Sequence, residues 1–247
     1  MQSVTPLQQR EVETYFSVLA DGVNDRTLQA RAYHNLGKYE AGDFRDLSAL
    51  LDATGADGSI AVLGRDAEER ADIIEDLHAN GHELVLHGHR HVGCSDLPAE
   101  LARENVMTGV EAIESAAGVT PAGFFAPLQR MNTATVEAVA DAGMDWVFGQ
   151  PEGTVPDDLD VIEPANPYDL GLLGDGYSPT ETFDRLAEQA ESGSNGFLVH
   201  PNMLEYFDAM AAFEEWLREY QPTSVGTAIA EGGIGMVLDC LRPLKIE

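Results

Sequence analysis

The stretch SIAVLGRDAEERADIIEDLHANGHELVLH, residues 59–87, decides the fold class. It opens with a short apolar run at 59–64, continues with apolar residues at helical spacing over 66–80, and closes with a second apolar run at 83–87. Gly81 stands where the helical pattern ends, a place where glycine is common. Two short apolar strands joined through a helix form a βαβ unit, and its strands are parallel. The stretch therefore predicts an α/β protein.

The same alternation of strand and helix continues on both sides of this unit. Further strands are predicted at 28–34, 122–126, 144–149, 196–200 and 236–241, and further helices at 5–20, 43–54, 97–117, 132–142, 179–192, 205–219 and 223–231. About seven or eight parallel strands with helices outside favour a barrel over an open sheet. No long linker divides the 247 residues, and α/β barrels of about 200–250 residues are common as one unit. We therefore expect a single domain over residues 1–247.

The charge of the chain is strongly acidic. Asp and Glu number 43 against 14 Lys and Arg, which gives a formal net charge of −29, and the only lysines are Lys38 and Lys245. Salt screens the self-repulsion of such a surface. The composition is therefore typical of a halophilic protein from a high-salt cytoplasm. Without a basic patch that could displace counterions from phosphate, nucleic acid is excluded as a partner.

The sequence contains no apolar run near the ~20 residues that a membrane span requires. The first residues lack the basic flank and apolar core of a secretory signal. Two cysteines, Cys94 and Cys240, are too few for a disulfide scaffold. We therefore expect a cytoplasmic protein without a membrane span.

Histidines lie at the predicted carboxyl ends of three strands, where ligands gather in parallel α/β folds. They are His34, the pair His87 and His91, and His200. If the chain turns helically after the strand, residues four apart lie on one face, and two imidazoles can then bind one metal ion. Cys94 is a second choice as a soft ligand, although a small buried thiol is the simpler interpretation.

The motifs around these histidines resemble those of the NodB-homology polysaccharide deacetylases. NGHELVLHGHRH (80–91) resembles the family's metal-binding motif H-[ST]-x-x-H, and SIAVLG (59–64) resembles the preceding strand ATFFVLG. GFFAPLQRMN (123–132) is similar to the third motif, GFRxPYGxxN, and LVH (198–200) to the L-x-H motif. Order and spacing agree over about residues 28–220.

The resemblance implies a distorted (β/α)7 barrel that removes N- or O-acetyl groups from carbohydrates with one divalent metal, often zinc. It implies that His87 and His91 are metal ligands. It also implies that His200 protonates the leaving group and that Leu198 lines the pocket for the acyl group. The partner would be an acetylated sugar.

Two of the family's motifs are altered in this chain. The first motif, T-F-D-D, supplies the general base and a carboxylate ligand, and its place reads AYHN (32–35). In the third motif, Phe125 stands for the family's Arg and Leu128 for its Tyr. That Arg pairs with the base Asp, so the loss of both is consistent, because either charge alone would be left uncompensated.

A rebuilt site follows from these changes. His34 joins His87 and His91 as a third ligand of Zn²⁺, with water in the fourth position, or it stays outside the metal shell as the base. Asn35 is a candidate ligand or substrate contact. Backbone N–H groups near Pro127 and Leu128 are candidates to hold the oxyanion.

Two other functions remain open. The first is a non-catalytic, carbohydrate-binding barrel that has lost the family's aspartate base. The second is a different metallohydrolase, a phosphoesterase or an amidohydrolase, in which His87 and His89 act as an H-x-H pair. The sequence leaves the oligomeric state open.

Overall fold

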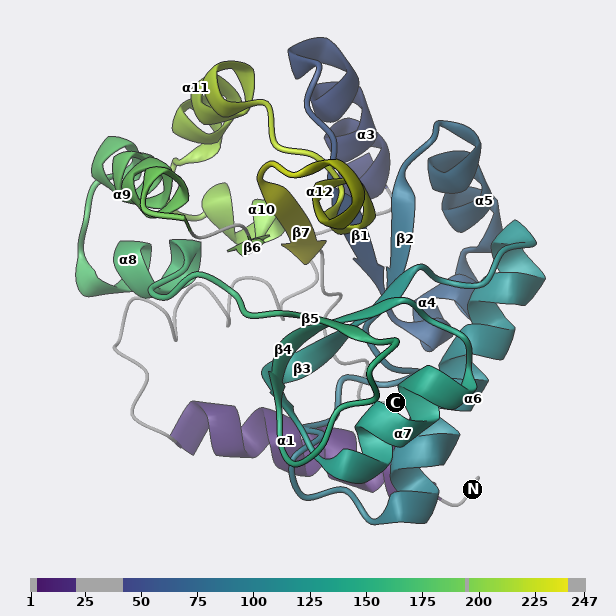
Figure 1. Ribbon diagram of the computed structural model, residues 1–247. Coiled ribbons are helices and arrows are strands. Elements are labelled where there is room, and N and C mark those ends of the chain that lie inside the picture. Colours follow the sequence, from purple (N-terminus) through teal and green to yellow (C-terminus); the bar gives the residue numbers. More distant parts are fainter. Residues whose placement is uncertain (1–3, 21–41, 194–195, 240–247) are drawn as a thin grey trace. The chain divides into compact units, whose positions relative to one another are not determined.

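The computed structural model describes residues 4–20, 42–193 and 196–239 of the chain (Figure 1). The strands are β1 (Ser59–Val62), β2 (Glu83–Leu86), β3 (Gly123–Met131), β4 (Trp146–Pro151), β5 (Asp160–Ile162), β6 (Gly196–Val199) and β7 (Gly235–Asp239). The helices are α1 (Pro6–Ala20), α3 (Gly42–Thr54), α4 (Gly64–Glu69), α5 (Ala71–Ala79), α6 (Ala99–Ala117), α7 (Thr133–Asp141), α8 (Asp169–Asp175), α9 (Pro179–Glu191), α10 (Pro201–Leu204), α11 (Met210–Tyr220) and α12 (Val225–Glu231). None of the helices in these ranges is both long and apolar enough to cross a membrane.

The strands follow the order β5-β4-β3-β2-β1-β7-β6. The pairs β2–β3, β3–β4, β4–β5 and β6–β7 are parallel. Every residue of β1, β6 and β7 is buried, as expected of parallel strands that helices cover on the outside. The predicted α/β fold of the (β/α)7 barrel type is confirmed.

Two predicted helices are interrupted. The helix predicted over 66–80 is divided at Arg70 into α4 and α5. Between the buried residues Ala67 and Ile73 no apolar side chain continues the core stripe, so packing does not hold one straight helix together. The helix predicted over 205–219 begins only at Met210, because Asp208 adopts a left-handed backbone with φ of 54° that a helix interior excludes.

The Pro- and Asp-rich stretch after β4 holds two elements that the sequence does not reveal. Strand β5 has three residues, none of them buried, so it lacks the apolar signal of the other strands. Helix α8 is too short for a helical period to stand out. The strand predicted at 28–34 lies outside the described residues.

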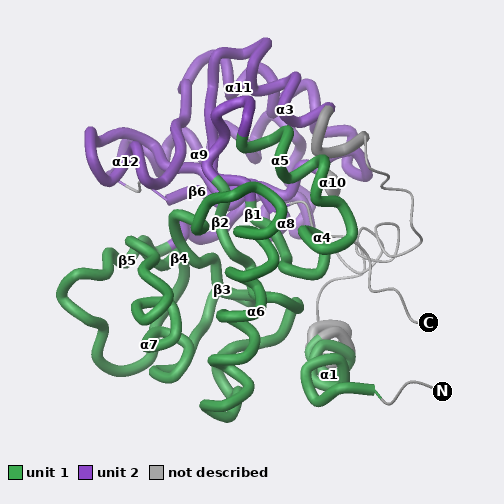
Figure 2. Tube along the Cα trace, turned by 90° about the vertical axis from the view of Figure 1, so that its right-hand side faces the viewer, with its two compact units in different colours: residues 1–22, 61–78, 84–163 green, residues 23–60, 79–83, 164–247 purple. Residues whose placement is uncertain are grey.

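The chain divides into two compact units, each built from three separate segments of the sequence (Figure 2). Unit 1 comprises residues 1–22, 61–78 and 84–163, and unit 2 comprises residues 23–60, 79–83 and 164–247. The division follows packing within each unit, and the single domain over 1–247 stays a prediction.

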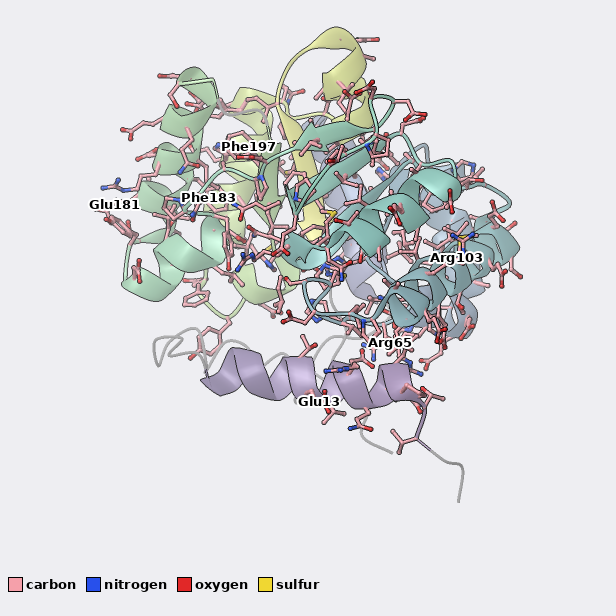
Figure 3. The ribbon with its side chains drawn as sticks, turned by 60° about the horizontal axis from the view of Figure 1, so that its bottom comes forward. Glu13, Arg65, Arg103, Glu181, Phe183 and Phe197 are labelled. Carbon is pink, nitrogen blue, oxygen red and sulfur yellow. The ribbon has the colours of Figure 1, made fainter. Side chains whose placement is uncertain are left out.

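Each unit has its own packed interior. In unit 1, α6 packs against α4 and α7 (Figure 1). In unit 2, an aromatic cluster joins helices α9 and α11 to strand β6. Phe183 lies 5.5 Å from Phe213 between ring centroids, and Trp216 lies 6.0 Å from both Phe183 and Phe197. Figure 3 labels Phe183 and Phe197 in this interior.

Candidate functional site

His87 directly follows β2 in unit 1 and is almost completely buried. Its backbone N–H donates to the Val62 carbonyl at 2.9 Å. Its ring Nδ1 lies 2.7 Å from the Phe125 carbonyl oxygen on β3. Because a carbonyl oxygen only accepts, Nδ1 carries the hydrogen and Nε2 carries the lone pair. This tautomer presents Nε2 as a possible metal-ligating atom.

Phe125 also holds the His87 ring by stacking. The two ring centroids lie 4.2 Å apart with an interplanar angle of 14°. Phe148 contacts the Phe125 ring edge-on, with 5.6 Å between the two centroids. Phe125 is 2% exposed. The residue that stands in the place of the family's Arg therefore fixes His87 through both its carbonyl and its ring.

His91 is half-buried, and its ring centroid lies 5.0 Å from that of His87. Residues 87–91 form a loop, so the prediction that a helical turn pairs the two histidines is wrong. The chain turns at Gly88, whose φ of 82° is left-handed and favours glycine. The loop nevertheless brings the two rings together, as the metal-site prediction requires.

Asn105 on α6 fixes this loop. The His89 N–H donates to the Asn105 carbonyl at 2.8 Å, and the Arg90 N–H donates to the Asn105 Oδ1 at 2.9 Å. The Asn105 amide donates in turn to the Arg90 carbonyl at 3.2 Å. Gly109 lets α6 approach closely, since a Cβ there would lie 2.9 Å from the His89 nitrogen. The backbone between the two histidines is thus held by three hydrogen bonds to Asn105.

His89 and Cys94 lie near the pair but have different surroundings. A Cβ on Gly64 would lie 2.8 Å from the His89 Nδ1, so this ring packs against the start of α4. Burial lowers the pKa of His89, because it disfavours the charged imidazolium. Burial raises the pKa of the Cys94 thiol to about 12, and its Sγ donates to the Val92 carbonyl. A protonated thiol is a poor metal ligand.

Pro127 and Leu128 lie where β3 is irregular. Pro127 is buried and has no N–H, so of these two residues only Leu128 can offer a backbone donor to an oxyanion. Leu128 and Gln129 have φ of 59° and 61°, and Leu128 is 41% exposed. Consecutive non-glycine residues in the left-handed region are strained, and such strain gathers at functional sites.

His200 follows β6 in unit 2 and is 6% exposed. Asp169 holds it twice: the His200 N–H donates to Oδ2 at 2.7 Å, and ring Nδ1 lies 2.8 Å from Oδ1. The Nε2 atom lies 3.6 Å from Asp239 Oδ2, at the end of β7. Both carboxylates are buried. The ring is thereby oriented as in an Asp–His catalytic pair. Leu198 is buried in β6, where it pairs with Val237.

A Ser–His–Asp arrangement in unit 2 has a structural role and not a catalytic one. His82 Nε2 lies 2.8 Å from the Ser48 hydroxyl, and Nδ1 lies 3.3 Å from Asp57. Ser48 and His82 are 4% and 5% exposed, so the hydroxyl cannot meet a substrate. The set lies before the amino end of β2, the end that serves stability in such barrels. We assign it to holding α3 against the turns that precede β1 and β2.

The sequence of residues 39–147 matches the profile of the family polysaccharide deacetylase. Over these residues the chain is similar to the polysaccharide deacetylases. No curated protein matches the sequence.

Solved structures show the same fold at low sequence identity. A protein described as a polysaccharide deacetylase from Mycobacterium smegmatis has a TM-score of 0.61 at 22% identity, over 85% of this chain and 79% of that one. A family 4 carbohydrate esterase from Streptomyces lividans, in complex with acetate, gives 0.56 at 17% identity, over 83% and 94%. BA3943, a CE4 family pseudoenzyme from Bacillus anthracis, gives 0.51 at 13% identity, over 81% and 60%.

The two histidines of unit 1 fit part of a divalent metal site. Imidazoles whose centroids lie 5.0 Å apart can both reach one ion at zinc–nitrogen distances of about 2.0–2.1 Å. Within the described ranges, no group of three or more His, Cys, Asp or Glu side chains is placed to hold a metal. His34 and Asn35 lie outside the described residues, so a third ligand from either stays a prediction.

Sequence reasoning missed Asp169 and Asp239. Asp239 could have been found, because it is a charged residue inside the apolar run predicted at 236–241, where an acidic side chain is rarely buried without a partner. Asp169 gave no such signal, since it begins a short helix that the sequence does not reveal.

Proposed function

We propose that the chain is a metal-dependent carbohydrate deacetylase that hydrolyses an acetyl amide or ester on a sugar. The observation that carries the proposal is the hydrogen bond from His87 to the Phe125 carbonyl, because it fixes the ring in the ligand tautomer beside His91. The family match and the neighbouring folds support the substrate class.

In unit 1, His87 and His91 would hold the metal, which we take to be zinc. When bound, such an ion polarises a carbonyl and lowers the pKa of water to about 7. Asn105 holds the backbone at His89 and Arg90, between the two histidines. The Leu128 N–H is the proposed donor toward the oxyanion.

In unit 2, His200 is the proposed proton donor to the leaving nitrogen or oxygen. Asp169 accepts from Nδ1–H and leaves Nε2 as the ring atom that gives and regains the proton. Leu198 is the proposed wall of the acyl pocket. His34 is proposed as a third ligand or as the base, and Asn35 as a ligand or substrate contact.

Zinc content tests the metal site of this proposal. Protein purified in high salt should hold one zinc ion per chain, and His87→Ala and His91→Ala should lose it. His89→Ala is the matched control, because this ring packs against α4, and it should keep the metal. Wild-type protein that takes up no zinc, even when zinc is offered, contradicts the proposal.

A second candidate is a carbohydrate-binding barrel without turnover. Phe125 in the place of the family's Arg favours it, and one protein of the same fold is described as a pseudoenzyme. This candidate predicts that acetylated oligosaccharides bind without acetate release and that His200→Ala leaves their affinity unchanged. Release of acetate by the wild type and its loss in His200→Ala would exclude it.

A further inference from the structure

Helix α1 carries a buried carboxylate. Leu7 and Glu11 are 2% and 3% exposed and lie one turn apart, on the same face of the helix. Glu13 projects from the exposed side, where it pairs with Arg10 at 3.1 Å. In Figure 3, Arg65 lies between α1 and the remainder of unit 1, whereas Glu13 points away from it. A buried carboxylate is tolerated only when charged or hydrogen-bonding partners compensate it.

The partners of Glu11 come from helix α4 and from the loop of residues 87–91. Its Oε1 receives the Arg65 guanidinium at 2.7 Å, and its Oε2 receives that of Arg90 at 3.0 Å. The His91 backbone N–H also donates to Oε1, at 3.3 Å. One carboxylate thus holds the backbone of His91 and both cationic side chains.

A second contact from the same helix continues this support. The Gly93 N–H donates to the Thr14 Oγ1 at 3.0 Å. Glu11 and Thr14 are three residues apart and so share a helix face. Helix α1 therefore binds the backbone at His91 and at Gly93, which follow the residues that Asn105 holds.

The two histidines depend on different supports. The His87 backbone continues the strand ladder of β2, and its ring is fixed by Phe125. The His91 backbone lies beyond the strand, and its N–H is bound by Glu11. Charge acts in the same direction, because the two guanidinium groups disfavour a divalent cation nearby and the Glu11 carboxylate offsets part of their positive charge.

We infer that Glu11 is a positioning residue for His91, and that helix α1 thereby belongs to the metal site. The inference rests on the proposed function, because it gives Glu11 a role toward the metal that His87 and His91 would hold. Partners of metal ligands affect metal affinity by about 10- to 100-fold.

Two measurements on full-length protein test this inference. Zinc affinity is measured by competition with a chromophoric chelator, and amide hydrogen exchange of residues 88–93 is followed in metal-free protein. Glu11→Ala should weaken zinc binding by about 10- to 100-fold and speed exchange in the loop. Glu13→Ala, the matched change on the exposed face, should alter neither quantity. If Glu11→Ala does not fold, Glu11→Gln keeps the size and removes the charge, and it should show a smaller loss of the same kind.

The outcomes separate this inference from the proposed function. A folded Glu11→Ala variant with wild-type zinc affinity and wild-type exchange overturns the inference, whatever the wild type does with sugars. A wild type that binds no zinc overturns the proposed metal site and the role of Glu11 toward it. If exchange is then still faster in Glu11→Ala alone, Glu11 is shown to hold the loop itself.

Discussion

The side chain of His87 is fixed by one residue, Phe125, whose carbonyl oxygen and ring both contact the imidazole. His200 is fixed in a similar way by Asp169, which binds both its backbone N–H and its ring. The sequence indicated the two histidines because they follow apolar strands. It could not indicate their tautomers, since the partners lie 38 and 31 residues away and come from other elements.

At Asp169 we predict a large effect from a small change. Asp169→Asn can present an amide N–H to His200 Nδ1, which favours the tautomer with the hydrogen on Nε2 in the neutral ring. Deacetylase activity should then fall by about 10²- to 10⁴-fold, and the downfield NMR signal of the Nδ1 proton should disappear. A variant that retains this signal and full activity would show that Asp169 does not orient the ring.

At the scale of elements, close approach between strands depends on small residues. Gly123 on β3 is in register with Trp146 on β4, and a Cβ on Gly123 would overlap the indole ring. The indole is 1% exposed and enclosed by the core of unit 1. The sequence showed an apolar strand here but not which position must lack a side chain.

Gly123→Ala should lower the free energy of unfolding by about 1–3 kcal/mol, because the rigid indole cannot yield without repacking. Gly171→Ala is the control, since a Cβ there would lie 3.5 Å from Pro167, an ordinary contact, within helix α8. It should be neutral or stabilising by up to about 1 kcal/mol. Urea unfolding measures both variants. Equal stability of the two would contradict this packing argument.

Glu83 joins the start of β2 to helix α12 in unit 2. Its carboxylate accepts from the Ser59 hydroxyl and from the Gly226 N–H. Burial raises the pKa of Glu83 above 4.5, against the opposing effect of these hydrogen bonds. The folded state therefore binds this proton more tightly than the unfolded state does.

The stability contributed by protonated Glu83 should be complete below about pH 4.5 and be lost as the pH rises through the raised folded value. Glu83→Gln should remove this loss, so the variant gains stability relative to wild type between pH 4.5 and 7. Glu181 is the control of opposite sign, because hydrogen bonds from Ser178 lower its pKa. Glu181→Gln should lose stability relative to wild type as the pH rises from the lowered folded pKa of Glu181 toward about 4.5, and it should stay less stable above that pH. Chemical unfolding at several pH values decides both signs.

For the whole molecule, charge is the dominant property. A net charge of −29 over 247 residues opposes the compact state, and the repulsion acts over about 10 Å at 0.1 M salt but about 3 Å at 1 M. Buried pairs such as Glu11 with Arg65 are screened much less than exposed charges.

Raising KCl from 0.1 to 2 M should therefore raise Tm by roughly 5–10 °C, as expected if about 2–3 kcal/mol of repulsion is relieved in a protein of this size. Sucrose at equal osmolality is the control, because it stabilises by exclusion without screening charge. If sucrose matched the effect of KCl, charge repulsion would not be the cause, and the halophilic interpretation of the composition would lose its support.

The sequence by itself determined the α/β fold, the alternation of strands and helices, and the strand-end positions of His87 and His200. These features are local, because apolar periodicity and helix-end signals lie within a few residues of one another. The sequence did not predict the division of helix 66–80, strand β5 or helix α8, because the apolar pattern there is weak or too short.

Only the tertiary structure decided what surrounds His87, His91 and His200. Phe125, Glu11 and Asp169 reach them from other elements, with Glu11 separated from His91 by 80 residues of chain. Such contacts depend on how closely elements pack, which glycines such as Gly109 and Gly123 permit and which no period in the sequence records. These distant partners set the ring orientation of His87 and His200 and hold the backbone of His91, so they became visible only in the folded chain.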